Sequence, residues 1–431
     1  MSEGPLDLPT PIPPPPFWQR VAGLRRRMSW KQAFTALKYP NYRLWFWSQM
    51  FSMFGTWMES TALGFLVYDL TKSPAYLGLV GFAAGVPTWL FMLYAGAIAD
   101  RVPRRNLLVV TQTAMMGLAF ATAALTFLHW IRPWHILIMA FGLGTANAFE
   151  APARQSFLLE MVDREDMTNA IALNSAMFNT AMALGPAAGG LIYGFLGPAW
   201  CFAINGATFV AVIAALRRMK LPPFVPPARR TSALADIREG LRYVAGHPLI
   251  RTVIGLIGVV SLFGVSFVTL FPSWAVRALH GDARTNGFLQ SSRGLGALLA
   301  ALIIASLGRF HFRGRLLTVG TFALPVAVAL FGLVRWLPLA LLFAFASGLA
   351  QILIFNLANA LVQTHSPDAL RGRIMGVYTM TFFGLMPLGA LWVGIAAERA
   401  GQPAAILGGA AVMLGAAAAL AAFMPHLRRQ S

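Results

Sequence analysis

The chain has 431 residues, of which 57% are hydrophobic and only 11% are charged. A soluble globular domain carries about a quarter charged residues, so these proportions exclude an ordinary water-soluble fold. The net charge of +19 would suit a nucleic-acid-binding protein if the basic residues formed one patch. They are instead divided between alternate loops, which excludes nucleic acid and favours membrane lipids as partners.

Apolar runs long enough to cross a hydrocarbon core as helix recur along the chain, without the period-2 alternation of a membrane β-barrel. We therefore predict an all-α membrane protein with twelve transmembrane helices in two six-helix halves. The predicted spans are residues 41–68, 75–99, 106–128, 134–153, 169–196, 199–216, 252–276, 287–308, 316–334, 338–362, 374–397 and 404–424.

The basic residues give these spans an orientation. Of the 34 Lys and Arg, 27 lie in or beside the N-terminal segment, the loops after spans 2, 4, 6, 8 and 10, or the C-terminal tail. Only 6 lie in the opposite loops. By the positive-inside rule, we expect a multi-pass protein of the bacterial inner (plasma) membrane with both termini in the cytoplasm.

The distribution of spans divides the chain into five segments. The longest loop contains Ala233 to Gly246, where apolar and charged residues fall on opposite sides of a predicted amphipathic helix lying along the membrane surface. The predicted segments are a disordered, basic cytoplasmic N-terminal segment (1–40), an N-terminal six-helix bundle (41–216), a cytoplasmic linker with that helix (217–251), a C-terminal six-helix bundle (252–424) and a cytoplasmic tail (425–431).

The two halves also resemble each other. Asp166 follows span 4 in the pattern D-x-x-N-A, and Asp368 follows span 10 in the pattern D-x-x-R-G, 202 residues later. Such repeats are typical of transporters that bind substrate between their halves and alternate access by rocking them.

The first span contains an acid, Glu59. Ser48, Ser52, Gly55 and Glu59 recur at spacings of 4, 3 and 4, so they share a helical face that we expect to line a central cavity. A carboxyl group in a low dielectric can exchange protons near neutral pH. Glu59 is therefore a candidate proton-coupling residue, and a static acid bonded to a neighbouring helix is the alternative.

The loop after span 2 has the pattern G-x-x-x-D-R-x-x-R-R, formed by Gly96, Asp100, Arg101, Arg104 and Arg105. A glycine lets a neighbouring helix approach, and an acid among arginines can hold an ion-pair network that breaks when the halves move. The pattern resembles the signature loop of the major facilitator superfamily, although Pro103 stands where that family usually has glycine. The resemblance implies a cytoplasmic gating motif in which Asp100 latches the halves at span 11.

The same resemblance implies that Arg104 pairs with an acid on span 4. Glu150, near the cytoplasmic end of that span, is the acid available. A carboxylate at that depth is costly unless it is paired, which fits either a latch or a proton site. Glu150 is therefore the predicted partner of Arg104 and a second candidate for proton coupling.

Span 5 contains proline and paired glycines, which can kink a helix and admit a close neighbour. The residues are Gly185, Pro186, Gly189 and Gly190. They resemble the end of the antiporter motif of exporters in this superfamily, although the upstream glycines of that motif are missing. The resemblance implies export, and helix packing alone is the alternative.

Further stretches resemble the enterobactin-exporter-like branch of this superfamily. They begin at Leu70, Asn147, Asn169 and Pro367. Members of that branch export siderophores or drugs, so the resemblance implies a small amphipathic cargo without identifying it.

Arg293 lies inside span 8, at a depth similar to that of Glu59. A guanidinium group can neutralise an acid or bind an anionic group of the cargo through forked hydrogen bonds, and packing is the alternative. In span 10, Asn356 and Asn359 share a face with Gln363. These asparagines are further cargo-binding candidates, although interhelical hydrogen bonds would explain them equally well.

The sequence contains no constellation typical of catalysis, no P-loop and no metal-binding spacing, and Cys201 is its one cysteine. We predict no enzymatic activity, no cofactor and no metal. The predicted function is a monomeric, proton-coupled antiporter that exports a small amphipathic molecule, siderophore or drug-like, by alternating access. A facilitator importing a small metabolite and a non-transporting membrane scaffold or sensor are the alternatives.

Overall fold

The computed structural model describes residues 34–99, 101–158, 160–221, 233–307 and 313–423. All regular secondary structure in these ranges is helical, as predicted. The first half contains η1 (Thr35–Lys38), α3 (Pro40–Thr71), α4 (Pro74–Ala99), α5 (Arg104–Phe127), α6 (Pro133–Leu158), α7 (Met167–Leu196) and α8 (Pro198–Arg218). The second contains α9 (Ala233–Gly246), α10 (Pro248–Val259), η2 (Val260–Val265), η3 (Ser266–Leu270), α11 (Phe271–Arg277), α12 (Ala283–Leu307), α13 (Arg313–Leu333), α14 (Leu337–His365), α15 (Arg371–Ala400) and α16 (Gln402–Phe423).

Local sequence explains several helix ends. Proline occupies the first turn of α3, α8 and α10, where its missing N–H group needs no partner within the helix. Gly197 and Gly401 follow the ends of α7 and α15 with φ angles of +92° and +87°, which residues with a Cβ atom rarely adopt. The fifth span of each half therefore ends in the same way.

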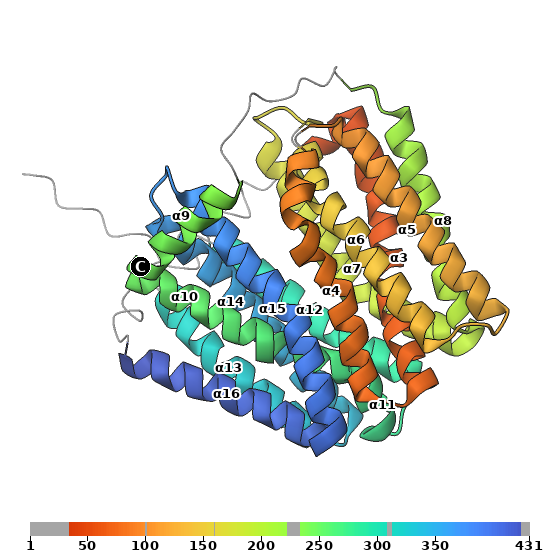
Figure 1. Cartoon of the computed structure of the whole chain (residues 1–431), viewed down its shortest axis with the longest axis vertical. Coiled ribbons are helices and arrows are strands. Elements are labelled where there is room, and N and C mark those ends of the chain that lie inside the picture. Colours follow the sequence, from red (N-terminus) through yellow and green to blue (C-terminus); the bar gives the residue numbers. More distant parts are fainter. Residues whose placement is uncertain (1–33, 100, 159, 222–232, 308–312, 424–431) are drawn as a thin grey trace, which may run out of the picture.

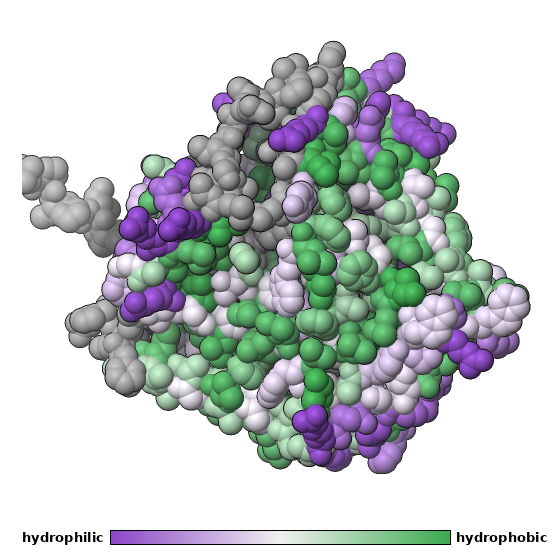
Figure 2. Space-filling view, viewed as in Figure 1, coloured by the Kyte–Doolittle hydropathy of each residue, from purple (hydrophilic) through white to green (hydrophobic). Residues whose placement is uncertain are grey.

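The helices form a membrane-spanning bundle. Within the described ranges, 10 segments are both long and apolar enough to cross a membrane, with α10 to α11 counted as one. The more polar α3 and α7 are 32 and 30 residues long and pack in the same bundle, which completes the twelve predicted spans. Apolar side chains cover the middle of the molecule and hydrophilic ones gather at its two ends (Figure 2).

We call the end of the bundle where α3 begins and α8 ends the terminal face, and the other end the opposite face. Four exposed tryptophans lie where helices begin or end at the opposite face, as in the aromatic belt of a membrane protein. They are Trp130, Trp134, Trp200 and Trp336.

The seventh span differs from the continuous helix predicted over 252–276. It runs through α10, a π-helical turn (η2), a 3-10 turn (η3) and then α11. Pro272 stands in the first turn of α11, where it cannot donate the hydrogen bond that a continuous α-helix requires. The proline therefore accounts for the 3-10 turn just before α11, but not for the π-helical turn at Val260–Val265.

The two halves contact each other through glycines near the opposite face. Cβ atoms added to Gly78 of α4 and Gly190 of α7 would lie 2.5 Å from Ala390 O of α15 and 2.6 Å from Ala283 O of α12, so these backbones touch. A Cβ atom on Gly96, at the terminal end of α4, would meet no atom of the described residues within 4 Å. The expected close approach at Gly96 is therefore wrong for this conformation, because the halves diverge toward the terminal face (Figure 1).

The D-x-x-N-A motif fastens the start of the described chain to the segment before α7. Asp166 accepts a hydrogen bond of 2.8 Å from the Tyr39 hydroxyl and forms an ion pair of 2.6 Å with Lys38. Asn169 Oδ1 accepts from the backbone N–H of Ala36 at 2.9 Å. Residues 1–33 of the predicted N-terminal segment, like 424–431 at the other end, lie outside the described residues.

In the second half, α9 takes the position that η1 has in the first half. The helix covers the predicted range and packs on the beginning of α15, where Arg373 forms an ion pair with Glu239. A Cβ atom on Gly240 would lie 2.8 Å from Arg373 O, so the two helices are in backbone contact. In both halves a helical segment before the first span is thus bound to the start of the fifth.

Candidate functional site

Glu59 is buried between two helices of the first half. Its side chain is 4% exposed, and Oε2 accepts a hydrogen bond from Asn205 Nδ2 of α8. One turn earlier, a Cβ atom on Gly55 would overlap the Asn205 side chain. The expectation that this face lines a central cavity is therefore wrong, because the missing side chain of Gly55 lets α8 cover it.

The partners of Glu59 are uncharged. The Asn205 side chain also accepts a hydrogen bond from Thr208 Oγ1, at 3.2 Å. Glu59 forms no ion pair with any described residue. A negative charge without a cation beside it is energetically unfavourable inside a membrane. A structural acid would be expected to have a cationic partner, and Glu59 has none among the described residues.

Arg293 of α12 binds α14 and not Glu59. Its Nη2 donates to Gln351 Oε1 at 2.9 Å, while its buried Nε has no hydrogen-bond partner. The residue lies about 15 Å along its helix from the opposite face, and Glu59 about 18 Å, at 1.5 Å per residue. Their depths are similar, as predicted, but the charge-pair interpretation does not hold in this conformation.

Gln351 could not be selected from the sequence, since a single polar residue in an apolar span forms no recognisable pattern. The asparagines that were selected lie farther along α14. Asn359 Oδ1 accepts from Gln363 Nε2 at 2.6 Å within the same helix, and Asn356 is exposed. Asn359 is eight residues, or about 12 Å, from Gln351 along the helix axis. The structure therefore does not group the asparagines with Arg293.

A cluster of polar side chains connects the two halves. It could not be predicted from the sequence. Asn286 of α12 is fully buried, and its Nδ2 donates to Thr61 O of α3 at 3.4 Å. Gln290 Nε2 donates to Asn286 Oδ1 at 3.3 Å. Among the described residues, no three His, Cys, Asp or Glu side chains gather where a metal ion could be held.

At the terminal face, the predicted pair between Arg104 and Glu150 is wrong. Arg104 forms an ion pair with Glu160, just beyond the end of α6. Glu150 lies eight residues before the end of α6, about 12 Å deeper, whereas Arg104 is the first residue of α5. A guanidinium group at the membrane surface does not reach that depth.

Glu150 has other partners inside the first half. Its side chain is 5% exposed, and Oε1 accepts a hydrogen bond of 3.1 Å from Gln112 Nε2 of α5. Arg154, one turn farther along α6, lies 3.8 Å from the same oxygen. The cation and the amide together compensate its charge.

The other residues of the loop motif have separate places. Asp100 lies outside the described residues. Arg101 is exposed, and Arg105 Nη1 donates to Met219 O beyond the end of α8 at 3.3 Å.

The glycine-proline motif of α7 packs between α3 and α12. Cβ atoms on Gly185 and Gly189 would each lie 2.7 Å from α3, at Trp57 Cβ and at Met58 O. Gly190 and Pro186 face α12, and the N–H group of Ala187 donates to Ser291 Oγ at 2.8 Å. The motif thus lies where the two halves meet.

Comparisons with known proteins agree with this architecture. The family model described as "Transmembrane secretion effector" matches residues 31–430. The chain is 27% identical over 384 residues to the multidrug efflux pump Tap of Mycolicibacterium fortuitum, covering 87% of this chain and 93% of Tap. It is 26% identical over 366 residues to the enterobactin exporter EntS of Escherichia coli strain SMS-3-5, covering 82% of this chain and 84% of EntS.

Solved transporters share the fold at low sequence identity. The nucleoside transporter NupG superposes with a TM-score of 0.67 at 17% identity, covering 90% of this chain and 98% of NupG. A bacterial homologue of the human lysosomal transporter Spinster, inward-facing and unoccupied, gives 0.68 at 14% identity, covering 88% and 96%. The chain therefore belongs to the transmembrane secretion effector family of the major facilitator superfamily, whose members are membrane transporters.

Proposed function

We propose that this transporter exports a small amphipathic molecule from the cytoplasm in exchange for protons, with its terminal face in the cytoplasm of a bacterium. The names of Tap and EntS support efflux. The α7 motif supports it further, because it lies at the contact between the halves. The observation that carries the coupling is the burial of Glu59 against a neutral amide.

Alternating access fits the distribution of inter-half contacts. The glycine contacts at Gly78 and Gly190 bring backbones together without interlocked side chains, so they can separate without unpacking a core. Gly96, at the other end of α4, has open space into which α15 can move. Rocking of the halves would separate the helices at Gly78 and Gly190 and close the space beside Gly96. Asp100 and Arg104 would then form part of the cytoplasmic gate.

Glu59 is the better of the two proton-coupling candidates. Its one polar partner in the described part of the chain, Asn205, carries no charge, so gain and loss of a proton change the electrostatic energy of the site strongly. Glu150 has Arg154 within 3.8 Å and is already compensated. One proton entering down ~150 mV supplies roughly 3.5 kcal/mol, enough for a gradient of several hundredfold.

The test uses purified protein in proteoliposomes with an imposed pH gradient, and ethidium and enterobactin as probes. We expect wild type to transport a probe uphill and Glu59→Gln to exchange it without uphill transport, since an amide cannot cycle a proton. Glu165→Gln, the same change in an exposed loop, is the matched control. Uphill transport by Glu59→Gln at the wild-type rate would rule out this coupling site, and probe entry into the compartment facing the termini would contradict export.

A further inference from the structure

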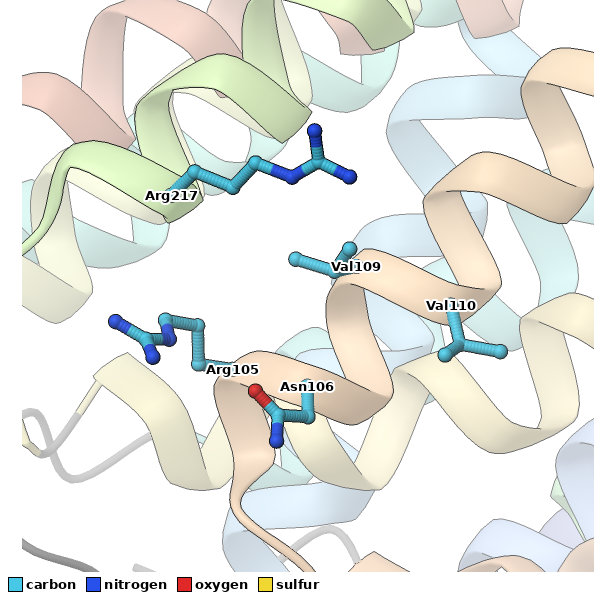
Figure 3. Close-up of a pocket in the computed structure, with 5 residues that line it drawn as sticks. All are labelled: Arg105, Asn106, Val109, Val110 and Arg217. Carbon is cyan, nitrogen blue, oxygen red and sulfur yellow. The ribbon is translucent and has the colours of Figure 1, made fainter.

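A basic pocket lies at the terminal face between α5 and α8. Its volume is about 320 Å³, and Arg105, Asn106, Val109, Val110 and Arg217 line it. Arg217 extends from the last turn of α8 across the space toward α5, which carries the other four residues (Figure 3). Two guanidinium groups and an amide from two helices thus surround one pocket.

No described acid neutralises either arginine. Arg105 donates to the carbonyl oxygen of Met219, and neither Arg105 nor Arg217 forms an ion pair with a described residue. Glu160, just beyond the end of α6 at the same face, is already paired with Arg104. The pocket is therefore positively charged and complementary to an anion.

A separate apolar groove lies on the neighbouring face of α5 and extends toward the middle of the membrane. It encloses about 720 Å³ between α5 and α6, and Val110 lines both the pocket and the groove. Ala114, Gly117 and Phe141 line its deeper part, and a Cβ atom on Gly117 would meet nothing within 4 Å. Gly117 lies twelve residues, about 18 Å, deeper along α5 than Arg105.

We propose that the pocket and groove together bind one anionic phospholipid. The headgroup phosphate lies between Arg105 and Arg217, with the Asn106 amide as a further donor. One acyl chain passes over Val110 and fills the groove beside Gly117. A charged pocket at the membrane surface, joined at Val110 to a neighbouring apolar groove, matches the two ends of this ligand and no soluble anion. The proposal depends on neither cargo nor proton coupling.

The charge of the pocket is tested on the delipidated full chain in detergent, titrated with fluorescent phosphatidylglycerol and, separately, phosphatidylcholine. We expect Arg217→Gln to weaken phosphatidylglycerol binding roughly fivefold to tenfold. Arg218→Gln removes the same charge from the next residue, which does not line the pocket, and should bind like wild type. Equal losses in both variants, no loss in Arg217→Gln, or equal affinity for both lipids would overturn the proposal.

The groove is tested with substitutions that leave the charge unchanged. Gly117→Leu and Ala114→Leu each place a side chain in the groove, and either should weaken phosphatidylglycerol binding severalfold. Tail-free glycerol phosphate, added as a competitor, should displace the lipid only at far higher concentration. Wild-type lipid affinity in both groove variants, or competition by glycerol phosphate at equal concentration, would show that the site takes a soluble anion instead.

Discussion

Each half holds a charged side chain within a membrane span that is bound by a neutral amide from the same half. Glu59 of α3 binds Asn205 of α8, and Arg293 of α12 binds Gln351 of α14. Neither charge depends on the other half, so rocking the halves breaks no ion pair at these positions. Each site can therefore keep its contacts through a transport cycle.

The two sites differ in how far the charged side chain is buried and in whether its hydrogen bonds are all formed. Glu59 is almost inaccessible, whereas Arg293 is half-buried and its Nε lacks a partner. An inaccessible acid with a neutral partner suits a proton, the smallest ligand. We propose that Arg293, which keeps one unpartnered donor, binds an anionic group of the cargo.

The largest effect is expected where a glycine supports the cation site. A Cβ atom on Gly348 of α14 would overlap the backbone carbonyl of Arg293, so Gly348→Val should lower the free energy of unfolding by about 1–3 kcal/mol. In the first half, Gly55→Val should cost less, because it meets the Asn205 side chain, which can rotate. Melting of the purified protein measures both. Gly415→Val, which meets open space, is the control, and a smaller loss at Gly348 than at Gly55 would contradict the comparison.

The second prediction separates the two roles. Arg293→Gln should weaken binding of an anionic probe about tenfold, because charge-assisted hydrogen bonds are lost, while transport remains coupled to the pH gradient. Glu59→Gln should leave binding of the anionic probe unchanged and abolish the coupling of transport to the pH gradient. Equilibrium binding and gradient-driven flux are recorded on the same preparations. Loss of coupling in Arg293→Gln would mean that the two sites are not independent.

The third prediction concerns the gate. A double-mutant cycle of Arg104→Ala and Glu160→Gln, read as transport rate, should give a coupling energy of about 0.5–3 kcal/mol. The cycle of Arg104→Ala with Glu150→Gln should be additive, since those residues are not in contact. Protein abundance should stay near that of wild type in every variant. A coupling energy between Arg104 and Glu150, with none between Arg104 and Glu160, would contradict the ion pair seen in the structure.

The smallest effect is expected at the docking of η1. Hydrogen bonds from Lys38 and Tyr39 lower the pKa of Asp166 below its ordinary value. The ionised form is thus favoured by folding, so its stabilisation is present above the ordinary carboxyl pKa and is lost as pH falls through the lowered value. Melting of wild type and Asp166→Asn from pH 7 to about pH 3 should converge at the acid end. A difference that persists at low pH would assign the effect to packing; Glu165→Gln is the control.

The spans could be predicted from the sequence alone, because the length of an apolar run and the charge of the loops beside it are local properties. It also located the α7 motif and the helix over 233–246, since proline, glycine and amphipathic spacing act within a few residues. It located Glu59, whose charge is conspicuous in an apolar helix.

The partner of each functional residue, in contrast, is known only from the way the helices pack. Helical periodicity groups Gly55 with Glu59 on one face, but the neighbour that covers this face depends on how closely α8 approaches. The partner of Arg104 depends on the relative depth of two helices, and Gln351 becomes significant only beside Arg293. Contacts between helices are set by packing among residues far apart in the chain, and no local pattern records that packing.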